Sequence, residues 1–145
     1  ESCKIKAKIV KKDEKEKDVR KILNFGHTFA HGFESAKKFS KSLNHGEAVL
    51  LGMLVASDLS NRKKILDNKE VLKIKKHYAN LELFMSIKKV FKKKSEINKI
   101  ISFMEKDKKN VDKKINLILL SKIGKTKQIS LKNMEVKKFL SSYYN

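Results

Sequence analysis

Glycine and histidine are concentrated in one segment of this 145-residue chain, and that segment restricts the fold more than any other. Four of the five glycines and three of the four histidines lie between residues 24 and 52. Gly26 and Gly32 fall in a stretch whose apolar residues recur at helical spacing. Each glycine lowers helix propensity by about 1 kcal/mol relative to alanine. A helix that contains both is therefore expected to need a close backbone approach or room for a ligand.

The apolar pattern predicts a mainly α-helical domain with one small β hairpin near the C-terminus. We expect helices at about residues 1–12, 19–38, 45–59, 67–78, 94–106 and 134–143. Asp18 is a candidate cap for the second of these, and either Asn44 or His45 begins the third. The third helix is apolar on most sides, so we place it at the centre of the domain. Residues 39–43 form a loop, and residues 116–121 and 128–131 form the hairpin.

Lysine dominates the charge of the chain. The formal net charge is +20, and only Arg20 and Arg62 among the 36 basic residues are arginines. Readout of base edges depends on the bidentate guanidinium group, and these lysines are spread over nearly every segment. Abundant lysine, isoleucine and asparagine without proline or tryptophan is typical of an AT-rich coding sequence. We therefore expect no nucleic-acid partner, beyond weak binding to polyanions at low salt.

Other features concern size and cellular context. A chain of this length corresponds to one domain with a real core. It has no run of about 18 apolar residues, so we expect no membrane span. Cys3 is the single cysteine, which is typical of a reducing compartment and predicts a cytoplasmic protein. The chain does not begin with methionine, and its first residues have the composition of a helix interior. We expect a piece of a longer protein.

The histidines are the candidate metal ligands. His27 and His31 are spaced i, i+4, which places both on one helix face, and His45 follows a short polar break. His27 and His45 are candidate zinc ligands, and a catalytic zinc needs a third protein ligand. The local candidates for that ligand are Glu16, Glu34 and Glu47, and the alternative is a ligand outside this chain. The competing interpretation is that His27 and His31 are ordinary hydrogen-bonded helix residues.

A possible substrate-binding face lies beside these histidines. Arg20 and Asn24 are four residues apart, and on one continuous helix they share a face with His27 and His31. A guanidinium group binds carboxylate or phosphate, an amide binds a hydroxyl, and an imidazole moves a proton. This set fits an anionic, hydroxylated substrate. The alternative for Arg20 is a surface ion pair with Glu16, which stabilises a helix by about 0.3–0.5 kcal/mol.

These residues resemble the C-terminal domain of the 3-dehydroquinate synthase family. The most specific segments are Asn24-Phe25-Gly26-His27 and the later His45-Gly46-Glu47. The matching segments in chain order are 5–10, 13–16, 20–31, 45–49 with 52–53, 107–109, and 118–120 with 123–125. The resemblance covers nearly the whole chain. One departure is Ala30, where the family commonly has glycine.

The resemblance implies a role for each matching residue. His27 and His45 are similar to two of the three metal ligands, and the third is a glutamate of the family upstream of this chain. His31, Glu16 and Lys6 resemble catalytic positions. The residues that resemble the substrate-binding set are Lys6, Arg20, Asn24, His31 and Lys108, with Lys109 as the alternative to the last. The resemblance therefore argues against Glu16, Glu34 and Glu47 as direct metal ligands.

The resemblance also implies the reaction. Members convert 3-deoxy-D-arabino-heptulosonate 7-phosphate to 3-dehydroquinate and phosphate in the shikimate pathway, using NAD and zinc or cobalt. The NAD-binding Rossmann-like domain of the family precedes this region, so we expect residues 1–145 alone to form one metal- and substrate-binding domain without activity. A homodimer is the usual state. The alternatives are a sister sugar-phosphate cyclase, such as a 2-deoxy-scyllo-inosose synthase, and a polyol dehydrogenase of the same fold.

Overall fold

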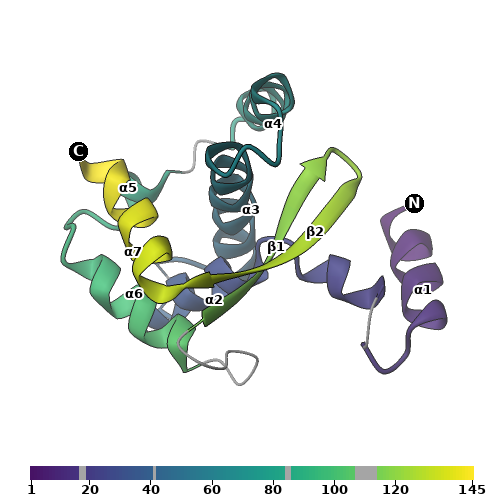
Figure 1. The fold of residues 1–145 in the computed structure, drawn as a ribbon, viewed down its shortest axis with the longest axis horizontal. Helices are drawn as coiled ribbons and strands as arrows, with labels where there is room; N and C mark the ends of the chain where they lie inside the picture. Colours follow the sequence, from purple (N-terminus) through teal and green to yellow (C-terminus); the bar gives the residue numbers. More distant parts are fainter. Residues whose placement is uncertain (17–18, 41, 84–85, 107–113) are drawn as a thin grey trace.

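The structure is a computed structural model that describes residues 1–16, 19–40, 42–83, 86–106 and 114–145. Its elements in chain order are α1 (Ser2–Lys12), the 3-10 helix η1 (Val19–Asn24), α2 (His27–Ala36), α3 (His45–Arg62), α4 (Asn68–Asn80), α5 (Ile87–Val90), α6 (Glu96–Glu105), β1 (Lys114–Lys122), β2 (Lys125–Lys132), α7 (Asn133–Ser141) and the 3-10 helix η2 (Ser142–Tyr144). The predicted class, mainly helical with a hairpin near the C-terminus, is confirmed (Figure 1). The predicted Asp18 cap lies outside the described residues.

Helix α3 runs through the middle of the molecule, as its apolar composition predicted (Figure 1). Its start is fixed by a capping box, in which the Asn44 side chain accepts a hydrogen bond from the Glu47 backbone at 2.9 Å and Glu47 Oε2 accepts one from the Asn44 backbone at 2.8 Å. Its buried residues include Leu51, Val55 and Leu59. Helix α2 and strand β1 pack directly against it. The first residue of α3, His45, is therefore held at a defined position beside α2.

The two C-terminal strands form an antiparallel hairpin whose inner face joins the same core. Ile115, Leu117 and Leu119 of β1 are buried, and the residues between them face the other way. Strand β1 is tied to α3 where the Leu120 backbone donates to Ser60 Oγ at 3.1 Å. This alternation leaves Asn116 and Ile118 on the outer face of the strand, where they line a cavity described below.

The continuous helix predicted over residues 19–38 is wrong. The segment forms η1, then a turn, then α2, and the break falls at Gly26, whose φ of +81° is left-handed. That conformation is accessible to glycine at little cost. Periodicity missed the break because Phe25, on the far side of it from Phe29 and Phe33, still packs against the core that buries them.

Other boundaries differ less. Helices at 2–12, 68–80 and 96–105 confirm the predictions within a few residues, whereas the short helix α5 (Ile87–Val90) was not predicted. The closing helix ends at Ser141 and continues as η2. Helix α1 has no buried residue and lies at the edge of the molecule (Figure 1). None of the helices in the described ranges is long and apolar enough to cross a membrane.

Candidate active site

Two helix starts bring the three clustered histidines together. His27 is the first residue of α2, His45 is the first residue of α3, and His31 lies one turn along α2. The ring centroid of His27 is 6.0 Å from that of His31 and 6.0 Å from that of His45, with edge-on geometry in both pairs. Residues 18 positions apart in the chain thus form one cluster.

The Nδ1 atoms of His27 and His45 are both engaged by the protein. His27 Nδ1 lies 3.3 Å from the Phe25 carbonyl oxygen, and His45 Nδ1 lies 3.1 Å from Glu34 Oε1. When each Nδ1 carries the hydrogen, it donates to that oxygen and the lone pair of Nε2 is left for a ligand. Metal-bound histidines almost always have this arrangement, since the second-nitrogen partner fixes both the tautomer and the ring orientation.

Electrostatics keep His27 neutral. Burial lowers the pKa of His27 below its ordinary value of 6.5, and the neighbouring His31 and His45 lower it further. The carbonyl of Phe25 and the carboxylate of Glu34 act in the opposite direction without reversing the shift. A neutral imidazole is the form that binds a metal ion.

The donor set fits two positions of a zinc or cobalt site. Two imidazoles on one tetrahedral zinc, with Zn–N bonds of about 2.0–2.1 Å, have ring centroids roughly 5 Å apart, close to the observed 6.0 Å. No group of three or more His, Cys, Asp or Glu side chains suited to a metal occurs among the residues that the structure describes. Of the local candidates, Glu34 binds His45 and Glu47 caps α3. A catalytic zinc held by these two histidines would need a third protein ligand from elsewhere.

A cavity of about 500 Å³ opens beside the histidines, between η1, the start of α2 and the hairpin. The predicted site residues that line it are Glu16, Asn24, His27 and His31. Asn24 Nδ2 donates to Glu16 Oε1 at 2.5 Å, so the two side chains hold each other. Glu16 has a φ of +52°, an uncommon backbone conformation for a non-glycine residue that often marks a functional position.

The structure does not bring every predicted site residue to this cavity. Arg20 is not among the lining residues, and its Nη1 atom donates to the Glu14 carbonyl at 2.6 Å. The single helix that was expected to carry Arg20, Asn24 and the histidines on one face does not form, although Asn24 still shares the cavity with His27 and His31. Lys6 lies on exposed helix α1, and Lys108 and Lys109 lie outside the described residues.

Sequence reasoning missed several lining residues. They are Lys15, Lys21, Thr28, Asn116, Ile118 and Gln128. Ile118 and Gln128 are opposite each other in the hairpin, and Thr28 Oγ1 donates to the Asn116 carbonyl at 3.2 Å across 88 residues of sequence. Two lysines at the rim favour an anionic ligand. No local pattern could pair the hairpin with α2, although the alternation of the strand does indicate which of its residues face outward.

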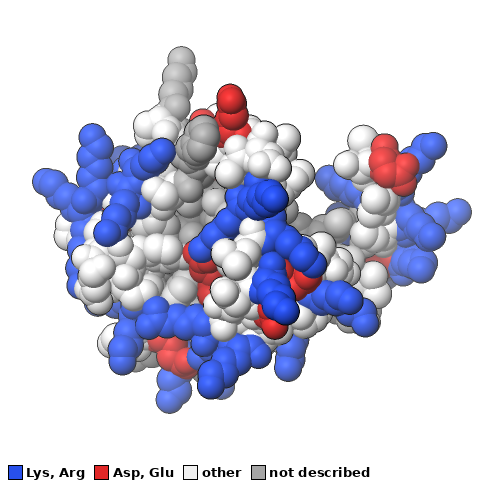
Figure 2. Space-filling view, turned by 90° about the horizontal axis from the view of Figure 1, so that it is seen from above, with Lys and Arg blue, Asp and Glu red and all other residues white. Residues whose placement is uncertain are grey.

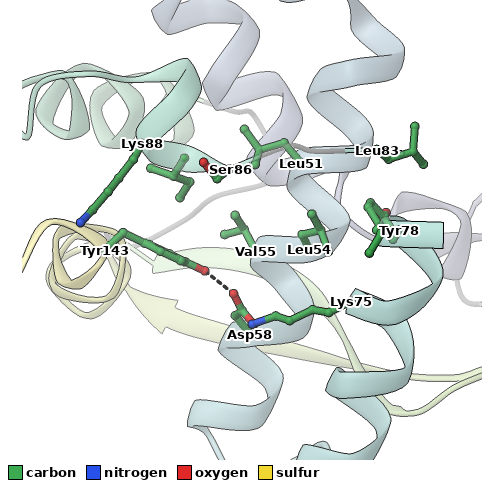
Figure 3. Close-up of a pocket in the computed structure, with 12 residues that line it drawn as sticks. Leu51, Leu54, Val55, Asp58, Lys75, Tyr78, Leu83, Ser86, Lys88 and Tyr143 are labelled. Atoms are coloured by element: carbon green, nitrogen blue, oxygen red, sulfur yellow. Dashed lines mark hydrogen bonds and ion pairs between the residues drawn. The ribbon is translucent and has the colours of Figure 1, made fainter. Parts of the chain in front are cut away.

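A second cavity, of about 440 Å³, lies between α3, α4, α5 and the C-terminus (Figure 3). Its walls are mostly apolar, and its main polar group is the carboxylate of Asp58. Asp58 accepts a hydrogen bond from the Tyr143 hydroxyl at 2.8 Å and pairs with Lys75 Nζ at 2.8 Å. Burial raises the pKa of Tyr143 far above its ordinary value, so the hydroxyl remains a donor. These polar groups bind one another, and we assign them a structural role.

Lysine and arginine side chains are distributed over the face seen in Figure 2 instead of forming one patch. At the histidine cavity, the lysines that line the walls are Lys15 and Lys21.

Comparison with known proteins identifies the family. The 3-dehydroquinate synthase C-terminal family matches residues 1–110. The chain belongs to this family. A 3-dehydroquinate synthase of Pelagibacter ubique (strain HTCC1062) is 55% identical over 124 residues, which are 86% of this chain and 33% of that protein. The 3-dehydroquinate synthase of Endomicrobium trichonymphae is 38% identical over 144 residues, covering 99% of this chain and 38% of that protein.

The chain thus spans about a third of the length of the curated 3-dehydroquinate synthases it matches. Among solved structures, a 2-deoxy-scyllo-inosose synthase has a TM-score of 0.75 at 23% identity, covering 93% of this chain and 37% of its own. Another, complexed with carbaglucose-6-phosphate, NAD+ and Co2+, has a TM-score of 0.68 at 23% identity and covers 88% and 35%. Over the matched region, these structures share the fold of this chain.

Proposed function

We propose that this domain carries the metal- and substrate-binding half of a 3-dehydroquinate synthase active site. The proposed reaction converts 3-deoxy-D-arabino-heptulosonate 7-phosphate to 3-dehydroquinate and phosphate. The observation that carries the proposal is the pair His27 and His45, whose ring centroids are 6.0 Å apart and whose Nδ1 atoms are both hydrogen-bonded. The pair lies beside a cavity lined by Asn24 and His31. The identity of 55% to a protein named 3-dehydroquinate synthase supports this substrate over that of a sister cyclase.

His27 and His45 would hold a zinc or cobalt ion. When bound, the ion acts as a Lewis acid that polarises a substrate oxygen. We propose that a glutamate outside this chain completes the ligand set, and that NAD is bound by another domain of the same protein. A homodimer in the cytoplasm is part of the same proposal.

The remaining residues position the substrate and move its protons. Asn24, held by Glu16, presents its amide to a substrate hydroxyl. His31 is exposed and lines the cavity, where it exchanges a proton with the substrate or its phosphate group. Lys15 and Lys21 lie at the same cavity and attract the doubly anionic substrate.

Lys6, Arg20 and Lys108 are further proposed substrate ligands. Arg20 currently donates to Glu14 and would have to turn to reach the cavity. Its backbone nitrogen donates to Asp13 Oδ2 at 2.9 Å, so the turn that carries Glu16 and the start of η1 are tied together. A small movement of that turn would change the positions of Arg20 and Glu16 together.

The test is phosphate release from 3-deoxy-D-arabino-heptulosonate 7-phosphate by the full protein, with and without NAD and Zn²⁺. The proposal expects release that depends on both, with 3-dehydroquinate as the product. A folded, zinc-loaded protein that releases no phosphate contradicts it. Phosphate release from a hexose 6-phosphate alone would indicate a sister cyclase, and oxidation of a polyol without phosphate release would indicate a polyol dehydrogenase.

A further inference from the structure

Helices α2 and α3 touch backbone to backbone immediately beside the histidine pair. A Cβ atom added to Gly52 of α3 would lie 2.2 Å from the Gly26 carbonyl oxygen and 3.1 Å from the Ala30 nitrogen. A Cβ atom added to Gly26 would lie 2.7 Å from the Met53 nitrogen. The neighbours that matter are backbone atoms, which cannot move aside as a side chain can.

This contact lies on the first hydrogen bond of α2. The Gly26 carbonyl accepts from the Ala30 backbone at 3.0 Å, and both of these atoms face Gly52. His27 is the next residue after Gly26, and His45 begins the helix that contains Gly52. The distance between the two histidines therefore depends on how closely the two backbones approach at this point.

We propose that Gly52 is a positioning residue that sets the spacing of His27 and His45 for a divalent metal ion. This inference rests on the proposed function. A methyl group at position 52 would push the start of α2 away from α3 by about 1 Å to reach ordinary contact distances. Metal–ligand distances tolerate deviations of about 0.2 Å, so the two nitrogens no longer reach one ion together.

The experiment compares Gly52→Ala with Gly32→Ala in the full protein. Gly32 lies in α2, and a Cβ atom there would meet Met104 Cγ at 2.8 Å, on a flexible side chain of α6. The control thus crowds the same helix without touching the contact with α3. We measure Zn²⁺ affinity by competition with a chromophoric chelator, the visible absorption of the Co²⁺-loaded protein, and the thermal unfolding midpoint without metal.

For Gly52→Ala we expect at least a tenfold loss of Zn²⁺ affinity and an altered Co²⁺ spectrum, as for other displaced ligand supports. For Gly32→Ala we expect wild-type affinity and spectrum despite a lowered midpoint. Wild-type values in folded Gly52→Ala would overturn the inference, and so would an equal affinity loss in both variants. If the wild-type protein itself binds neither ion, the proposed metal site fails instead.

A second variant approaches the same contact from α2, for the case in which Gly52→Ala does not fold. Asparagine tolerates positive φ, so Gly26→Asn retains the left-handed turn while its Cβ meets the Met53 nitrogen at 2.7 Å and the Gly52 carbonyl carbon at 3.0 Å. We expect a Zn²⁺ affinity below that of the wild type and a shifted Co²⁺ spectrum. Wild-type metal binding in folded Gly26→Asn would also overturn the inference.

Discussion

Replacing Glu34 by alanine should loosen the metal site without removing a metal ligand. Glu34 is buried in α2, and its Oε1 atom lies 3.1 Å from His45 Nδ1. The His45 side chain itself is 62% exposed, whereas that of Glu34 is 11% exposed. Among the described residues, the His45 ring is oriented by this hydrogen bond and by its edge-on contact with His27. Glu34→Ala leaves the exposed ring free to rotate.

The expected loss of metal affinity is large for a residue that contacts neither metal nor substrate. Removing the partner of a metal-bound histidine typically lowers metal affinity 10–100-fold, which is about 1.4–2.7 kcal/mol. His27 has burial as a second restraint, but His45 is mostly exposed and depends more on its hydrogen bond. We therefore place Glu34→Ala in the upper part of that range.

The assay is Zn²⁺ competition with a chromophoric chelator on the full protein. The matched control is Glu34→Gln, because its amide oxygen accepts the same hydrogen bond from Nδ1. We expect Glu34→Gln to lower Zn²⁺ affinity less than about tenfold, which is below the usual effect of removing the hydrogen-bond partner of a metal-bound histidine. Equal affinities for wild type and Glu34→Ala would refute the reasoning, and a loss as large in Glu34→Gln would show that charge, not orientation, is responsible.

Other expected outcomes test separate parts of the site and the fold. His27→Ala should abolish Zn²⁺ binding and turnover in the full protein, whereas His31→Ala should retain the metal and lose rate; loss of zinc in His31→Ala would show that the two roles are exchanged. Tyr143→Phe removes the hydroxyl that donates to Asp58 and should lower the free energy of unfolding by about 1 kcal/mol in urea titrations. Burial raises the pKa of folded Tyr143 above its unfolded value of about 10, so its contribution is complete below pH 10 and is lost as pH rises above it. Above pH 10 the free energy of unfolding of the wild type should therefore fall more steeply with pH than that of Tyr143→Phe, by up to about 1.4 kcal/mol per pH unit. Equal slopes in the two proteins would contradict this. Binding to DNA or RNA should disappear by about 200 mM salt, and tight binding that persists would revive a nucleic-acid function.

Local signals in the sequence predicted most of the helices and the hairpin. The Asn44–Glu47 capping box and the apolar residues that follow it define α3 without reference to the rest of the chain. The turn at Gly124, with a φ of +84°, similarly separates the two strands. The break at Gly26 escaped prediction because Phe25, just before it, packs against the same core that buries Phe29 and Phe33 of α2. The apolar pattern is therefore continuous where the backbone is not.

The candidate site was predictable only in its ligand types. Asn24, His27 and His31 were selected by chemistry and spacing, and the structure places all three at one cavity. Arg20 is oriented by its hydrogen bonds to the turn at residues 13–16. Helical spacing in the sequence carries no information on these bonds. Asn116 reaches the cavity through tertiary packing of the hairpin on α2. Such long-range contacts leave no periodic trace in the sequence.

The break at Gly26 also changes the electrostatics of the histidines. In a continuous helix over residues 19–38, His27 would lie mid-helix, where the peptide dipoles of neighbouring turns cancel. Because α2 begins at His27 and α3 begins at His45, two helix N-termini converge on one point. The partial positive charge at the N-terminus of α2 opposes protonation of His27, and both N-termini favour an anion nearby. Burial lowers the pKa of His27 in the same direction. The glycine that interrupts the helix therefore contributes both to the close approach of the two histidines and to the neutral, ligating state that a metal site requires.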